Sequence, residues 1–280
     1  MNEKNELQEN YSKAYILAVL TISWLVTIAL FINPTTGIKL FSIIMFIPGL
    51  LAIIFVKVLH KNSKAKLVYF AKKVSATSLL FGILYPLFFV IFCILIGIIT
   101  GIGELNIQKI FTIKDTITTI ISITATIFGV LGEEYGWRGY LLPELTKIKG
   151  KTNSTIIVGI VWALYHVPAV YLLARTTGSS NPLIVCFIQA CAIFTLSFPF
   201  SYCFYLSKNM LPVILFHSIW NFLNTTILGN IYRNEQGIIE GNLIFLNGEG
   251  VLGLVLGTCL IYWFIKQFKK DESSTRKTII

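Results

Sequence analysis

The feature that most constrains this chain is a series of apolar runs, each close to 20 residues long. A helix of that length crosses a hydrocarbon layer about 30 Å thick. Strands of a membrane barrel alternate apolar and polar residues, whereas these runs are apolar on all sides. The sequence therefore predicts an all-α, polytopic transmembrane helix bundle of about eight spans, at 14–33, 39–59, 77–100, 116–134, 154–174, 182–206, 210–229 and 251–268.

Composition agrees with a membrane protein. Apolar residues make up 55% of the 280 residues and charged residues only 13%, and the mean hydropathy is +0.75. No small-residue cleavage site precedes the first run, which is therefore interpreted as a span and not as a removable signal peptide. The five cysteines form no CxxC pair, so neither a disulfide nor a zinc knuckle is expected.

The positive charge is distributed unevenly between the two sides of the predicted bundle. Eight spans place 18 Lys and Arg residues on the side of the two termini and 5 on the other side. The positive-inside rule then predicts that both termini are cytoplasmic. The net charge of +10 is thus explained by topology and by contact with membrane lipid, and no nucleic acid partner is expected. The Ile-, Lys- and Asn-rich composition favours a bacterial plasma membrane.

A few ionisable residues lie within the predicted spans, where charge is costly and usually functional. They are Glu133, Glu134, His166 and His217, from three different spans. Helix geometry places all of them at a similar depth, in the half of the bilayer next to the termini. We therefore expect these side chains to meet, and a substrate to approach from the cytoplasmic side or laterally.

Each of these residues has a polar or charged neighbour at helical spacing. Glu134 and Arg138 are four residues apart, the favourable order for an ion pair in which arginine forks both carboxylate oxygens. His217 and Asn221 also share a helix face, and an asparagine amide is able to stabilise an oxyanion or orient an imidazole. Taken singly, each motif also fits a structural role, as charges at a helix end or as polar contacts between helices. Their common depth favours a shared site.

These motifs, in this order, resemble those of the CPBP family of intramembrane endopeptidases, which includes the CAAX prenyl proteases and the bacterial self-immunity (Abi) proteins. The family pattern is EExxxR, FxxxH and HxxxN on successive membrane helices. Here it appears as Glu133–Arg138, Trp162–His166 and His217–Asn221. Trp162 stands where the family usually has phenylalanine, a departure expected to affect the shape of the pocket and not the chemistry.

The resemblance implies a role for each residue. Glu133 is the general base that activates water, with His166 sharing that water. Glu134 and Arg138 support the site, and His217 and Asn221 stabilise the oxyanion. The chain then divides into N-terminal transmembrane helices (1–115), a catalytic core (116–229), and a C-terminal part (230–280) with an extracytoplasmic loop, the last span and a frayed cytoplasmic tail.

The predicted activity is hydrolysis of a peptide bond in a membrane-associated protein or peptide, in bacteriocin maturation or self-immunity. A metal-free mechanism is favoured because there is no HExxH motif. If zinc is used, its ligands are expected to be Glu133, His166 and His217. Two alternatives remain open at this stage: a catalytically silent immunity or scaffolding protein, and a proton-coupled transporter, since buried Glu and His also occur there.

Overall fold

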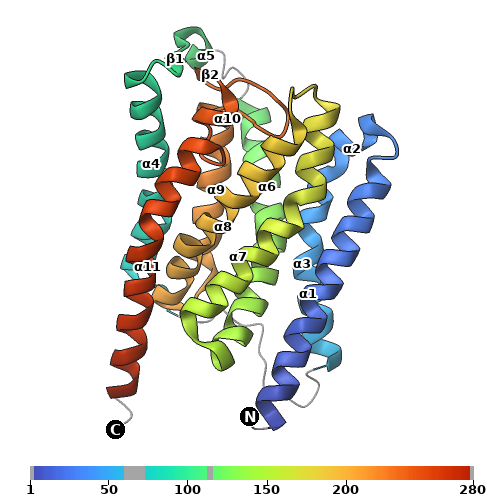
Figure 1. Cartoon of the computed structure of the whole chain (residues 1–280), viewed down its shortest axis with the longest axis vertical. Coiled ribbons are helices and arrows are strands. Elements are labelled where there is room, and N and C mark those ends of the chain that lie inside the picture. Colours follow the sequence, from blue (N-terminus) through green and yellow to red (C-terminus); the bar gives the residue numbers. More distant parts are fainter. Residues whose placement is uncertain (1–2, 60–72, 112–115, 278–280) are drawn as a thin grey trace.

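The computed structural model describes residues 3–59, 73–111 and 116–277 (Figure 1). Within this part of the chain, the fold is a helix bundle with one small antiparallel sheet of β1 (Gly103–Leu105) and β2 (Ile239–Gly241). The helices are α1 (Glu3–Leu30), α2 (Pro34–Leu40), α3 (Ile47–Ile54), α4 (Ala76–Ile99), α5 (Ile107–Phe111), α6 (Thr116–Gly136), α7 (Leu142–Thr176), α8 (Pro182–Ser207), α9 (Met210–Ile227), α10 (Leu243–Leu246) and α11 (Val251–Lys277). Short segments of altered helical pitch are η1 (Phe41–Phe46), η2 (Phe55–Leu59) and η3 (Trp137–Leu141).

Seven segments of the described chain are long and apolar enough to cross a membrane. One of them, Thr126–Thr176, has 51 residues and would measure about 77 Å as a straight helix. It is interrupted at Gly150, where φ is 74° and ψ is 172°. These angles favour glycine, because a Cβ is strained at positive φ. This segment therefore contains two crossings.

Contacts with α1 show that the chain reverses direction at Gly150. Before the break, the ring of Tyr140 lies 4.7 Å from that of Tyr15. Farther along, the Gln8 amide donates to the Glu144 carboxylate at 2.9 Å. The segment that leads to Gly150 thus runs antiparallel to α1, toward its first residues.

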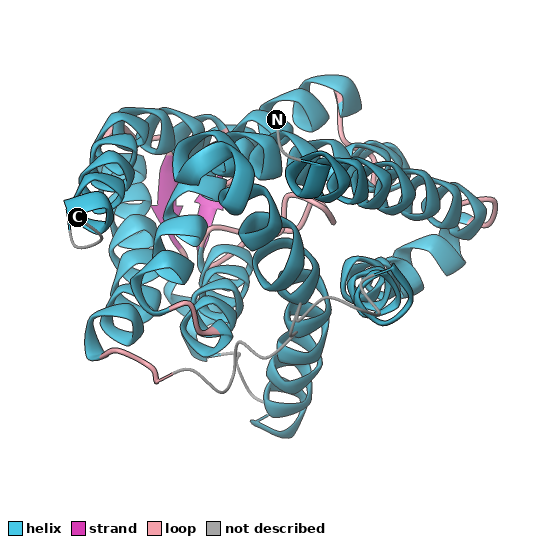
Figure 2. Cartoon of the chain, turned by 90° about the horizontal axis from the view of Figure 1, so that it is seen from below, coloured by secondary structure: helices cyan, strands magenta, loops and turns pink. Residues whose placement is uncertain are grey.

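After the break, α7 runs back along α1. The indole nitrogen of Trp24 donates to the carbonyl oxygen of Leu164 at 3.0 Å, so the chain has returned toward the end of α1. The prediction of an all-α bundle with about eight crossings is confirmed. Figure 1 shows both termini at one end of the bundle, and β1, β2, α5 and α10 at the other. Figure 2 shows the helices from the end that carries the termini.

The predicted end of the fourth span at residue 134 is wrong, because helix continues through η3 and into α7. Trp137, Arg138 and Tyr140 are buried there, so apolar packing extends the helix beyond the predicted span. Arg138 therefore does not belong among the residues that set topology. Its removal leaves 17 positive residues on the side of the termini against 5, and the asymmetry persists. Residues 60–72, most of the basic loop predicted between the second and third spans, lie outside the described residues.

The predicted frayed tail is also wrong as far as Lys277, where α11 ends. The Lys151 ammonium lies 3.1 Å from an Asp271 oxygen. Glu272 accepts a hydrogen bond from the backbone nitrogen of Lys151 at 2.5 Å. These contacts tie the last helix to the start of the second limb of α7. Residues 278–280 lie outside the described chain.

Close backbone packing fixes the helix that carries the two glutamates. A Cβ added to Gly49 of α3 would lie 2.4 Å from the carbonyl oxygen of Gly132 in α6. Only glycine allows such an approach, and small residues are typical of helix contacts in membranes. Gly132 precedes Glu133, so this contact sets the position of the candidate base.

Candidate active site

The residues singled out by the sequence come together around one cavity of about 830 Å³. Glu133 of α6, His166 of α7, and His217 and Asn221 of α9 line it. Glu134 and Arg138 are fully buried and are not among the lining residues. The predicted meeting of these side chains is thus what the structure shows.

Glu133 is 2% exposed and is held by two indole groups. Its Oε1 accepts hydrogen bonds from Nε1 of Trp162 at 2.5 Å and from Nε1 of Trp137 at 3.3 Å. Trp137 is four residues after Glu133 on the same face, and Trp162 reaches across from α7. Two neutral donors fix this carboxylate without neutralising its charge.

The imidazole of His166 faces Glu133. Its Nδ1 lies 2.8 Å from the carbonyl oxygen of Trp162, which only accepts, so Nδ1 carries the hydrogen. In the neutral ring, Nε2 is therefore an acceptor. Nε2 lies 3.8 Å from Oε1 of Glu133, and one water molecule is able to bridge two acceptors at this separation.

A buried group of three ionisable residues lies behind the cavity. Nη1 of Arg138 contacts both oxygens of Glu134, at 2.8 and 3.1 Å. The ion pair predicted from spacing is confirmed, but a single nitrogen makes both contacts and the predicted fork does not form. Oε1 of Glu134 also lies 2.8 Å from Nδ1 of His217. Glu134 thus links the arginine to a histidine 83 residues away.

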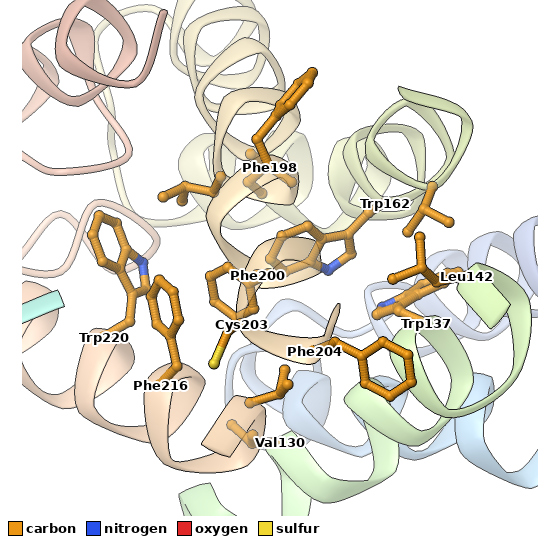
Figure 3. Packing of buried hydrophobic residues seen from close by; sticks show 14 of the residues in the cluster. Val130, Trp137, Leu142, Trp162, Phe198, Phe200, Cys203, Phe204, Phe216 and Trp220 are labelled. Atoms are coloured by element: carbon orange, nitrogen blue, oxygen red, sulfur yellow. The ribbon is translucent and has the colours of Figure 1, made fainter. Parts of the chain in front are cut away.

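Two aromatic rings cover the guanidinium of Arg138. Its central carbon lies 4.3 Å from the ring centroid of Trp162 and 4.7 Å from that of Phe200. Such cation–π contacts stabilise a cation that has lost its water. Phe200 in turn stacks on Phe216 at 4.2 Å, and Figure 3 shows these rings between Trp162 and Trp220.

The hydrogen bond to Glu134 determines whether Nε2 of His217 donates or accepts a hydrogen bond in the cavity. Glu134 is a carboxylate paired with Arg138, so its oxygen accepts the hydrogen bond from His217. Nδ1 of His217 therefore carries the hydrogen. Nε2 then donates only when the ring is an imidazolium. The amide of Asn221, one helical turn farther along α9, is a donor in either state.

The cavity extends from this cluster toward the end of the bundle opposite the termini. Its lining includes Thr226, Asn230, Tyr232, Arg233 and Glu249, which belong to or adjoin the end with the sheet (Figure 1). This differs from the predicted approach from the side of the termini. The difference arises because the lining residues beyond Asn221 come from the end of α9 and from the loops that follow it, at the end of the bundle that carries the sheet.

Sequence reasoning missed the bonds made by the tryptophans and the role of the C-terminal loop. Trp162 donates a hydrogen bond that phenylalanine lacks, so its substitution for the usual family residue changes the chemistry around Glu133 and not only the shape of the pocket. Glu249 was assigned to a loop, but it is 6% exposed and lines the cavity. The only sequence feature that set Glu249 apart from the other loop residues is its position in the tight turn NGEG, residues 247–250.

Residues 115–223 match the family model of the Rce1-like type II CAAX prenyl endopeptidases. This match supports the resemblance of residues 115–223 to the CPBP (CAAX protease) family. The match includes Glu133, Glu134, Arg138, His166, and the pair His217 and Asn221, and it ends before Tyr232 and Glu249. It supports an intramembrane endopeptidase of the CAAX type. A comparison with curated proteins gives no match to the chain.

The indole bond to Glu133 is testable by Trp162→Phe. We expect cleavage to slow on the order of tenfold, because a hydrogen bond to a charged group contributes about 1.5–3 kcal/mol and tenfold corresponds to about 1.4 kcal/mol. The measurement is the initial rate of peptide cleavage by the purified variant and by wild type in liposomes. Trp263→Phe, on the exposed face of α11, is the matched control. An unchanged rate for Trp162→Phe would mean that Trp137 alone holds Glu133.

Proposed function

We propose that this protein is a glutamate-dependent intramembrane endopeptidase that hydrolyses a membrane-associated peptide or protein. The observation that supports it best is the pairing of Oε1 of Glu133 with Nε2 of His166 at 3.8 Å on the cavity wall. Both atoms are acceptors, so together they orient one water molecule through its two hydrogens.

In the proposed reaction, Glu133 takes a proton from this water while the water oxygen attacks the scissile carbonyl carbon. The negative charge that forms on the carbonyl oxygen accepts a hydrogen bond from the Asn221 amide, and from His217 when that ring is protonated. The C–N bond then breaks, and Glu133 returns its proton to the leaving amine. Glu134 and Arg138 position His217 and do not contact the substrate.

A metal-free reaction fits the donor geometry better than a zinc site. No group of three His, Cys, Asp or Glu side chains in the described part of the chain is arranged to hold a metal ion. Nδ1 of both His166 and His217 is engaged, so each ring presents Nε2 to the cavity. This orientation suits a water acceptor and a metal ligand alike, and the distinction depends on the spacing of the three side chains. A catalytic zinc ion needs three protein ligands around one point. Glu133, His166 and His217 line the same cavity, but in the described chain they are not spaced as such a ligand set.

Chelation tests the proposed absence of metal. We expect that 1,10-phenanthroline or EDTA leaves the initial cleavage rate within twofold, and that elemental analysis of purified protein finds far less than one zinc per chain. Loss of activity on chelation, with recovery on adding Zn²⁺, would contradict the metal-free reaction and assign the metal to Glu133, His166 and His217.

We further propose that both termini are cytoplasmic, as the basic asymmetry supports, and that the protein lies in a bacterial plasma membrane. With this orientation the cavity extends toward the extracytoplasmic side. A substrate there would be a peptide leaving or inserted in the membrane, which fits bacteriocin maturation or self-immunity.

The experiment for this proposal is cleavage of membrane peptides by purified protein in liposomes, comparing wild type with His166→Ala. We expect the rate to fall by a factor of about 10² or more, because the water loses one of its two acceptors. His60, in the predicted basic loop, provides the matched control His60→Ala. Equal cleavage by wild type and His166→Ala would contradict the assigned role.

A further inference from the structure

A second polar cluster lies in the wall of the cavity, centred on Glu249, which lies beyond the segment 115–223 that matches the CAAX protease family. Oε2 of Glu249 accepts hydrogen bonds from the Tyr232 hydroxyl at 2.6 Å and from Nε2 of Gln189 at 3.0 Å. Oε1 accepts from Nε1 of Trp220 at 3.1 Å. The reaction proposed above uses none of these four side chains.

The turn that carries Glu249 is held by bonds that do not involve its carboxylate. Oδ1 of Asn247 accepts from the backbone nitrogen of Glu249 at 2.9 Å and from Nδ2 of Asn224 at 3.0 Å. Nδ2 of Asn247 donates to the carbonyl oxygen of Gly229 at 2.6 Å. The carboxylate is therefore placed by a rigid turn and is not required to anchor it.

The Glu249 carboxylate has the surroundings of an ionised group without a counter-ion. All three partners donate, and all are neutral. Burial, followed by the charge of Glu249, raises the pKa of Tyr232 well above its usual value, so this hydroxyl stays protonated and donates. Within the described residues, no Lys, Arg or His nitrogen forms an ion pair with Glu249.

A buried charge without a partner is costly, and a bound cation would offset that cost. A carboxylate offers about four acceptor positions, and three are filled here. Arg233, which also lines the cavity, is exposed, so water and salt screen its repulsion of a positive ligand.

The cluster lies beside the proposed reaction centre. Trp220, which binds Glu249, comes three residues after His217 and directly before Asn221 on α9. Asn221 and Glu249 line the same cavity, so a peptide whose carbonyl oxygen lies at Asn221 has its neighbouring side chains or terminus in the cavity that Glu249 lines.

We infer that Glu249 binds a cationic group of the substrate, a Lys or Arg side chain or a free amino terminus, and so selects peptides with a positive charge near the scissile bond. This inference rests on the proposed peptidase function. It assigns substrate selection to the C-terminal loop, whereas the reacting groups come from the matched segment.

The test uses the full-length protein in liposomes with synthetic peptides that share an apolar anchor. Each flanking position in turn carries lysine or Nε-acetyl-lysine, and mass spectrometry measures the products. We expect wild type to cleave the lysine peptide at least tenfold faster than its acetylated partner at one position. Glu249→Gln should bring this ratio close to one. Glu235→Gln, an exposed carboxylate of the same loop region, should keep the wild-type ratio.

The outcomes separate the two proposals. Cleavage by wild type with a ratio near one, or with a ratio that Glu249→Gln leaves unchanged, would overturn the role of Glu249 and leave the peptidase function intact. Absence of cleavage for all peptides would overturn the function and this inference with it. If Glu249→Gln unfolds the protein, the ratio measured on wild type decides alone.

Discussion

Replacing Glu133 by glutamine is expected to reduce cleavage by a factor of about 10³, within the usual contribution of a general base. Glutamine preserves the size of the side chain and one acceptor oxygen. This oxygen is able to accept from the two indole donors, which both bind Oε1 of Glu133, but the amide has no basic oxygen to take the proton of water. The expected loss corresponds to about 4 kcal/mol in the activation free energy.

The measurement is a single-turnover rate with purified protein in liposomes. Glu240→Gln is the matched control, because Glu240 of β2 pairs with Lys109 of α5, outside the cavity lining. Glu133→Gln should elute as the wild type does in size-exclusion chromatography. A rate within tenfold of wild type would show that Glu133 is not the base.

Replacing Arg138 by alanine is expected to have the largest effect on stability. Arg138 and Glu134 are both 0% exposed, and removal of one partner leaves a buried charge unpaired. Such changes typically cost about 3–5 kcal/mol. Loss of the contacts with Trp162 and Phe200 adds to this cost. For a chain of this size, the midpoint of thermal unfolding should fall by about 10 °C.

A double variant distinguishes loss of charge pairing from loss of volume. In Glu134→Gln/Arg138→Met both charges are gone, and the glutamine oxygen still accepts from Nδ1 of His217. It should therefore unfold at a higher temperature than Arg138→Ala, since a buried ion pair is often replaced by neutral groups at little cost. A double variant less stable than Arg138→Ala would contradict this explanation.

The sequence was sufficient for features that depend on local spacing or on long apolar runs. The helical fold class follows from the long apolar runs, because in lipid the backbone groups of such a run are hydrogen-bonded only if the run is a helix. The pair Glu134 and Arg138 follows from four-residue spacing. The convergence of Glu133, His166 and His217 was predictable because charge within a span requires a common polar site.

Long-range contacts of polar groups were not predictable in the same way. The bond from His217 to Glu134 joins residues 83 positions apart, and no local pattern specifies it. Glu249 looked like a loop residue because its neighbours are Gly and Asn. Its burial results from the bonds of Asn247 and from the packing of the loop over α9. The reversal at Gly150 falls between the predicted spans 116–134 and 154–174, and no local pattern specified that helix continues on both sides of it.

Peptide analysis of cells tests the central claim most directly. Cells that produce wild type or Glu133→Gln at equal amounts are compared for peptides with new termini in membrane and medium. If Glu133 activates water for intramembrane cleavage, a set of peptides should occur with wild type and disappear with Glu133→Gln. The same peptides at the same abundance in both cells would contradict it.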